Sequence, residues 1–293
     1  MTDSGKKRGD AAKRIARAVL PPVALTTYRR LRDRRRPAPV TEWEYLPGGW
    51  PESSEEGPGW NAESVVRTQL DRWPAFEKSV AAPAAFGLSN EARSGTRDYG
   101  VHNTILTFGY VLATAAAGHK RLSMLDWGGG IGHYCVYAHE LMPGLEIDYH
   151  CCDLPALVAA GRSVLPDATF HSDPDEALSR MYDLVLASSS LQYSREWKTL
   201  LRKLAMSTRQ YLYVTRQPFV ENAPSFVVLQ RPHRHGYETE YPGWFLNRGE
   251  FLAEAEAAEL RLVREVMIME NPVVPGVPEQ ADYRGFLFER VGR

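Results

Sequence analysis

Seven consecutive residues, Asp126-Trp127-Gly128-Gly129-Gly130-Ile131-Gly132, carry most of the chemical information in the chain. They follow a β-rich run and precede a stretch with helical spacing. Glycines at such a junction allow a tight turn, let a ligand approach the backbone, and leave the N-terminus of the next helix open as a binding surface. The segment therefore predicts a nucleotide-binding loop.

Two acidic residues indicate which nucleotide this loop would bind. Asp153 ends the next predicted strand, where a carboxylate can accept hydrogen bonds from a ribose diol. The dinucleotide pattern GxGxxG fails, because no glycine stands in its sixth place when it is counted from Gly128 or from Gly130. Asp126, directly before the loop, would repel a pyrophosphate but not a cation. We therefore expect a nucleoside that carries an ammonium group and a sulfonium.

The loop resembles the first motif of class I S-adenosylmethionine-dependent methyltransferases, which has the form acid-x-Gly-x-Gly-x-Gly. The resemblance covers about residues 100–290 and implies an α/β fold, a Rossmann-like sheet with helices on both faces, and S-adenosylmethionine as cofactor. It implies these cofactor-binding residues: Asp126, Gly128, Gly130, Gly132, Asp153, Leu154, Asp173 and Ser188.

The same resemblance assigns a role to each side chain in this set. Asp126 would orient the loop near the amino group, and Asp153 would hold the ribose hydroxyls. Leu154 would touch adenine, and Ser188 would face the methionine side. Asp173 has two interpretations, because it could bind the adenine amino group or cap the helix that follows it.

Four sequence blocks carry a narrower resemblance, to bacterial methyltransferase-like proteins of surface-polysaccharide and specialised-metabolite pathways. The blocks are LDWGGGIGHY, LASSSLQYSREW, YLYVTRQPF and VLQRPHRHGYETEYPGWFLNRGEF. The resemblance implies methyl transfer to a hydroxyl or amine of a small polar metabolite or sugar. Two alternatives stay open: a cyclase that consumes the cofactor and releases methylthioadenosine with azetidine-2-carboxylate, and a non-catalytic binding module.

Three side chains are candidates for the chemistry itself: His102, Tyr193 and His235. Methyl transfer from a sulfonium chiefly requires alignment, exclusion of water and sometimes removal of a proton. Imidazole titrates near neutrality, so either histidine could act as a base, and a hydrogen-bonded structural role is the alternative for both. His233 and His235 have no third ligand at suitable spacing, so we expect no metal.

Short β-rich runs alternate with helical stretches from Leu122 onward, which is typical of a sheet with helices on both faces. The predicted strands are 122–127, 146–151, 168–171, 182–187, 210–215, 261–269 and 284–290. The predicted helices are 61–78, with Asn61 as N-cap, 101–117, 133–141, 154–165, 174–180, 195–206 and 251–260.

Charge and composition divide the chain into three parts. Residues 1–36 hold twelve basic and three acidic residues, a local charge of +9 within a net charge of −1. This basic tail predicts either a solvated segment or an amphipathic helix on an anionic membrane surface. Residues 37–60 read as a linker or cover. Residues 61–293 form the methyltransferase-like domain, with helical N-terminal additions and a substrate-covering insertion at about 216–249.

The remaining compositional features exclude several classes of protein. The hydrophobic content of 44% and charged content of 24% are ordinary for a globular protein. No apolar run is long enough to span a bilayer, and the N-terminus lacks a secretory signal, so the cytoplasm is the expected compartment. Three cysteines without CxxC spacing predict neither disulfides nor a zinc site. The expected partner is a small molecule, without specific nucleic-acid binding; the sequence leaves the oligomeric state open.

Overall fold

The computed structural model describes residues 41–52, 59–86 and 98–292 of the chain. The chain divides between Thr41 and Glu42, and the fold described below belongs to Glu42–Arg293. The basic tail at 1–36 lies outside the described residues, so its two interpretations stay predictions. None of the described helices is long and apolar enough to cross a membrane.

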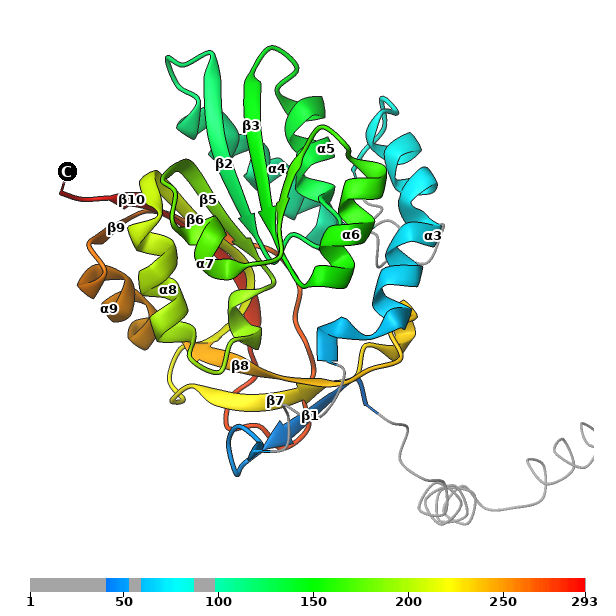
Figure 1. Cartoon of the computed structure of the whole chain (residues 1–293). Coiled ribbons are helices and arrows are strands. Elements are labelled where there is room, and N and C mark those ends of the chain that lie inside the picture. The colour runs from blue at the N-terminus through cyan, green and yellow to red at the C-terminus, as the bar shows by residue number, and fades with distance from the viewer. Residues whose placement is uncertain (1–40, 53–58, 87–97, 293) are drawn as a thin grey trace, which may run out of the picture. The chain divides into compact units, whose positions relative to one another are not determined.

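A mixed sheet forms the centre of the fold (Figure 1). Strands β4, β3, β2, β5 and β6 run parallel in that order, and β10 and then β9 add antiparallel to β6. The strands are β2 (Arg121–Trp127), β3 (Glu146–Cys152), β4 (Thr169–His171), β5 (Tyr182–Ser188), β6 (Thr208–Val220), β9 (Leu260–Met267) and β10 (Asp282–Arg290).

Helices cover both faces of this sheet, as the alternating pattern predicts (Figure 1). Their apolar faces build two cores, one on each side of the sheet. One face carries α3 (Glu63–Val80), α4 (Tyr99–Ala115), α5 (His133–Leu141) and α6 (Pro155–Val164). The other carries α7 (Pro174–Leu178), α8 (Trp197–Met206) and α9 (Arg248–Ala257).

Three further strands extend the sheet beyond the parallel part. Strand β6 continues past the end of β5, and its last residues, Phe219 and Val220, pair with β8 (Tyr241–Asn247). Strand β7 (Phe226–Gln230) pairs antiparallel with β8, and β1 (Trp43–Leu46) pairs antiparallel with β7. The predicted linker at 37–60 therefore contains a strand, and the predicted insertion at 216–249 contains a hairpin.

Most helix boundaries differ from the sequence prediction by up to three residues, and capping explains the earlier start of α9. Helix α9 begins three residues before the predicted start, because the Asn247 side chain accepts a hydrogen bond from the Glu250 N–H and so caps it. The predicted N-cap of α3, Asn61, is wrong. Asn61 lies in the 3₁₀ turn η2 (Gly59–Asn61), and the N-cap position is Ala62, whose side chain cannot bond.

The contact between α6 and β4 makes a stability prediction. A Cβ at Gly161 would lie 2.3 Å from Cε1 of Phe170, a ring buried in the core. Gly161→Ala should therefore lower the free energy of unfolding by about 1–3 kcal/mol through overpacking. Gly144→Ala is the matched control, because a Cβ there meets nothing within 4 Å. Urea unfolding of both variants measures the difference, and equal stabilities would contradict the packing of Gly161 against Phe170.

Candidate functional site

The glycine loop turns the chain from the end of β2 into α5. Gly128, Gly130 and Gly132 adopt φ values of +70°, +62° and +96°, a region that L side chains rarely occupy. A Cβ at Gly128 would lie 2.5 Å from Cβ of Ser190, so the loop also depends on close approach. The glycines at these positions are therefore required by the turn itself.

The N–H groups of these glycines already have acceptors within the protein. Gly128 donates to the Cys152 carbonyl oxygen (2.8 Å), Gly130 to Oδ2 of Asp153 (2.7 Å) and Gly132 to the Gly129 carbonyl oxygen (3.1 Å). A phosphate-binding loop instead presents free N–H groups to its ligand. The bonding of this loop therefore disfavours an anionic pyrophosphate.

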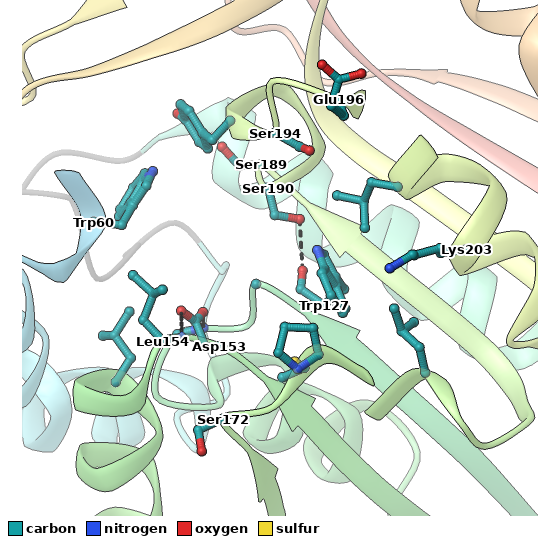
Figure 2. A pocket seen from close by; sticks show the side chains of 18 of the residues that line it. Trp60, Trp127, Asp153, Leu154, Ser172, Ser189, Ser190, Ser194, Glu196 and Lys203 are labelled. Atoms are coloured by element: carbon teal, nitrogen blue, oxygen red, sulfur yellow. Dashed lines mark hydrogen bonds between the residues drawn. The ribbon is translucent and has the colours of Figure 1, made fainter. Parts of the chain in front are cut away.

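Two cavities meet at the loop, a larger one of about 510 Å³ and a smaller one of about 140 Å³. The larger chamber is lined by residues at the carboxyl ends of β2 and β3 and by residues of α6, α7 and α8; Figure 2 shows side chains of its lining, Trp127, Asp153 and Lys203 among them. The smaller chamber is lined by residues of α4 and α5, the end of β5 and Arg216 within β6. Five residues line both and so mark their junction: Trp60, Gln69, Gly128, Gly130 and Ser189.

Asp153 and Leu154 line the larger chamber (Figure 2). The Asp153 carboxylate accepts from the N–H groups of Gly130 and Leu154, both at 2.7 Å. Burial raises the pKa of Asp153, and these two hydrogen bonds oppose that shift. The carboxylate is thus fixed beside the loop, with its two oxygens pointing to neighbouring backbone amides.

Ser188 lines the smaller chamber and bonds the Tyr134 hydroxyl (Oγ to Oη, 2.7 Å). Next to it, Ser189 has a φ of +51°, and Arg216 on the adjacent strand has a φ of +50°. Both residues line the same chamber. Left-handed conformations of non-glycine residues store strain and concentrate at functional sites. The strained residue after β5 and the strained residue within β6 thus both lie at this chamber.

Asp126 lies beneath the loop and lines neither chamber. Its side chain is fully buried, and Oδ2 accepts a hydrogen bond from the Tyr149 hydroxyl at 2.5 Å. Oδ1 has no hydrogen-bond partner among the described residues. Burial raises the pKa of Asp126 to about 7, despite the bond from Tyr149. The motif acid is therefore a buried group that titrates near neutrality beneath the site.

Two other members of the predicted cofactor set lie away from the chambers. Asp173 caps α7 by accepting from the Asp175 N–H (2.9 Å) and is exposed; its neighbours Ser172 and Pro174 line the larger chamber instead. Of the two interpretations of Asp173, the structure shows the helix cap. Gly132 faces the core, where a Cβ would lie 2.7 Å from Cδ1 of Leu165.

Of the three predicted catalytic side chains, Tyr193 alone lines a chamber. Its hydroxyl donates to Oε1 of Gln230 (2.8 Å), and its ring packs edge-on against Trp60, with ring centroids 5.1 Å apart. These contacts hold the phenol at the wall of the larger chamber. Tyr193 belongs to the 3₁₀ turn η3 (Leu191–Tyr193) after β5.

The two predicted catalytic histidines lie outside both chambers, and their assignment to the reaction stays a prediction. Nδ1 of His102 lies 2.8 Å from the Phe86 carbonyl oxygen, and this ring lines neither chamber. His235 lies in the turn η4 (His233–His235), with Nε2 at 3.6 Å from a Glu42 carboxylate oxygen, and also lines neither chamber. Each histidine makes the structural contacts that its alternative interpretation predicts.

Trp60 and Gln69 are residues of the site that the sequence analysis missed. Trp60 belongs to the segment read as a linker, and Gln69 lies in α3. Neither stands in a recognisable motif, because their place at the junction depends on tertiary packing of an N-terminal segment against the loop. The described residues contain no group of three or more His, Cys, Asp or Glu side chains able to hold a metal.

The raised pKa of Asp126 predicts how stability depends on pH. A carboxyl with a higher pKa in the folded state than in the unfolded state binds more protons when folded, so its contribution to stability is lost as the pH rises through about 7. Relative to Asp126→Asn, the wild type should lose about 2–3 kcal/mol of unfolding free energy between pH 5 and pH 8. Urea unfolding across this range measures the difference, and parallel pH profiles would contradict burial of an ionisable Asp126.

Comparisons with known proteins agree with the architecture of the sheet. The sequence matches no protein-family model, and no curated protein sequence is similar enough to count as a match. The chain is similar to the crystal structure of magnesium protoporphyrin IX methyltransferase from Synechocystis PCC 6803 with SAM bound. The TM-score is 0.50 at 14% identity, over 84% of this chain and 100% of the other.

A second solved structure is more distant. The 1,6-didemethyltoxoflavin-N1-methyltransferase from Burkholderia thailandensis matches with a TM-score of 0.42 at 14% identity, over 64% of this chain and 78% of the other. The parallel order β4-β3-β2-β5-β6 and the likeness to the Synechocystis enzyme lead to one conclusion. The chain has the Rossmann-like fold of class I methyltransferases.

Proposed function

We propose that the protein binds S-adenosylmethionine across its two chambers and transfers the methyl group to a small acceptor. The observation that carries this proposal is the bonding of the glycine loop, in which the N–H groups of Gly128, Gly130 and Gly132 are engaged internally, while Oε1 of Gln69 at the junction has no partner among the described residues. Such a surface favours a cationic nucleoside over a dinucleotide phosphate. The fold, shared with a methyltransferase that binds SAM, supports the same ligand.

The residues present fit this ligand in size and chemistry. The bare backbone at Gly128 and Gly130 leaves the junction open, and a Cβ at Gly130 would contact Gln69. Asp153, fixed beside Gly130, is placed to accept hydrogen bonds from ribose hydroxyls. Leu154 and Leu157 give the larger chamber an apolar wall that suits adenine. The smaller chamber has room for a short polar chain.

When bound, S-adenosylmethionine supplies a methyl group on a sulfonium, whose displacement leaves a neutral thioether. The residues of the protein then have to align the acceptor and exclude water. Tyr193 is suited to aligning the substrate. Its hydroxyl donates a hydrogen bond to Gln230, and the same oxygen can accept one from an O–H or N–H group of the substrate to be methylated. No described histidine is needed as a base at this position.

We propose further that the acceptor is a small polar metabolite or sugar with a reactive hydroxyl or amine. The wall near Tyr193 combines aromatic rings, Trp60 among them, with the hydroxyls of Ser189, Ser190 and Ser194. Sugars use both kinds of contact, apolar ring faces and short polar side chains. On this proposal, the β7–β8 hairpin of the predicted insertion supports the substrate cover, because Gln230 on β7 holds Tyr193.

Product analysis tests the proposal directly. The full chain is incubated with S-adenosylmethionine and a panel of sugars, hydroxy acids and amines, and the products are identified by mass spectrometry. Adenosylhomocysteine together with a methylated acceptor is the expected result. Formation of methylthioadenosine without any acceptor would contradict methyl transfer and show that the protein cyclises the donor instead. Binding of the donor without either product across the panel would favour a binding module.

A further inference from the structure

Gln69 is the buried polar residue of the site that no other part of the account explains. It lies on α3, in the N-terminal addition to the fold, and is 5% exposed. It lines both chambers at their junction. Its Oε1 is buried and has no hydrogen-bond partner among the described residues. A buried amide oxygen without a donor lowers stability, so it marks a place where a ligand's donor belongs.

The amide of Gln69 lies directly against the glycine loop. A Cβ built on Gly130 would be 2.9 Å from Oε1 of Gln69 and 3.6 Å from its Nε2. The missing side chain at Gly130 therefore makes room for the amide at the floor of the junction. Because the Gly130 N–H already donates to Asp153, it is not the donor that Oε1 lacks.

The surroundings of Gln69 favour a cationic donor. Asp153 borders the same junction, and Asp126 lies under the loop with its own oxygen Oδ1 unpartnered. Each carboxylate, when ionised, attracts positive charge. Arg216, which is ion-paired with Glu270, also lines the smaller chamber. A zwitterionic chain that places its ammonium at the junction and its carboxylate toward Arg216 matches this distribution of charge.

We propose, resting on the proposed function, that Gln69 is a specificity-determining residue for the amino-acid tail of the donor. Its Oε1 accepts a hydrogen bond from the α-ammonium group of that tail. The nucleoside occupies the larger chamber beside Asp153, and the tail enters the smaller one past Gln69. The N-terminal helix α3 thus contributes directly to recognition of the donor, in addition to covering the sheet.

A double-mutant cycle that changes the Gln69 side chain and the amino group of the ligand tests this assignment. Calorimetry measures the Kd of adenosylhomocysteine and of its deaminated analogue, which lacks the α-amino group, for the wild type and for Gln69→Met. Methionine keeps the length of the side chain but removes the amide oxygen. We expect Gln69→Met to weaken adenosylhomocysteine binding about 10-fold and to leave the deaminated analogue within about 2-fold.

Two further variants keep the result interpretable. Gln69→Glu retains an acceptor oxygen and adds a negative charge, so it should bind adenosylhomocysteine at least as tightly as the wild type. Gln217→Met is the matched control, because Gln217 is a buried glutamine with an unpartnered Oε1 that lines neither chamber, and it should leave both affinities unchanged. If Gln69→Met does not fold, the Gln69→Glu cycle with the two ligands serves in its place. There the carboxylate should increase the preference for the aminated ligand.

The possible failures separate the inference from the proposed function. Equal losses for both ligands in Gln69→Met would assign Gln69 to the nucleoside or to the fold and overturn the inference. Unchanged affinities in Gln69→Met would also overturn the inference. Binding of adenosylhomocysteine by the wild type would still support the proposed function in that case. A well-folded wild type that bound neither ligand would contradict the proposed function itself.

Discussion

Replacing Asp153 by alanine is expected to weaken adenosylhomocysteine binding by about 30- to 100-fold, the largest loss we predict for a single side chain. The substitution removes a carboxylate that would accept charge-assisted hydrogen bonds from the ribose. It also removes the acceptor of the Gly130 and Leu154 N–H groups, so the loop loses its anchor. Asp153→Asn keeps one acceptor oxygen and should lose less, about 10-fold. Calorimetry on the folded variants measures both values.

Asp173→Ala is the control for this prediction. Asp173 is also an acid after a neighbouring strand, but it caps α7 and lines neither chamber. Its removal should lower stability by about 1 kcal/mol through the lost cap and change ligand affinity by less than about 3-fold. If Asp173→Ala weakened binding as much as Asp153→Ala, the assignment of the ribose site to Asp153 would be wrong.

The second large effect is expected from Gly130→Ala, which should weaken adenosylhomocysteine binding by at least about 10-fold. The new Cβ would lie 2.9 Å from Oε1 of Gln69, at the floor shared by the two chambers. It would also hold an L side chain at a φ of +62°. The strain should cost about 1–2 kcal/mol of stability. Thermal unfolding and calorimetry separate the two effects.

Gly118→Ala isolates the contribution of backbone strain. Gly118 has a φ of +78°, but a Cβ there meets nothing within 4 Å, and the residue lines neither chamber. It should show a similar loss of stability with unchanged ligand affinity. An equal loss of affinity in Gly118→Ala would mean that general destabilisation, and not obstruction at the junction, explains Gly130→Ala.

Local patterns were sufficient to predict the parallel part of the fold. Largely apolar runs such as Leu122–Trp127 and 182–187 are typical of strands buried on both faces, and each lies within an observed strand. The boundaries of α5 coincide with the prediction because the glycine loop begins the helix sharply at His133. Where one residue type dictates the local conformation, the sequence is sufficient.

Long-range pairing is the part that local patterns do not predict. Strand β1 is four residues long, and its partner β7 lies more than 180 residues away in the chain. Short strands among Pro and Gly carry little periodic signal, so 43–46 reads as linker. The same holds within the site: Gly130 and Asp153 follow from a motif, whereas Trp60 and Gln69 reach the junction only through tertiary packing. A residue type suited to catalysis does not by itself predict where its side chain lies: neither His102 nor His235 lines a chamber.

On the proposed function, the glycine loop selects a cationic adenosyl donor because the N–H groups of Gly128, Gly130 and Gly132 are already bonded within the protein. Calorimetry of the well-folded full chain with adenosylhomocysteine and, separately, with NAD tests it most directly. The account predicts saturable one-to-one binding of adenosylhomocysteine and no detectable binding of NAD. Saturation by NAD, with no uptake of adenosylhomocysteine by the same preparation, would contradict it.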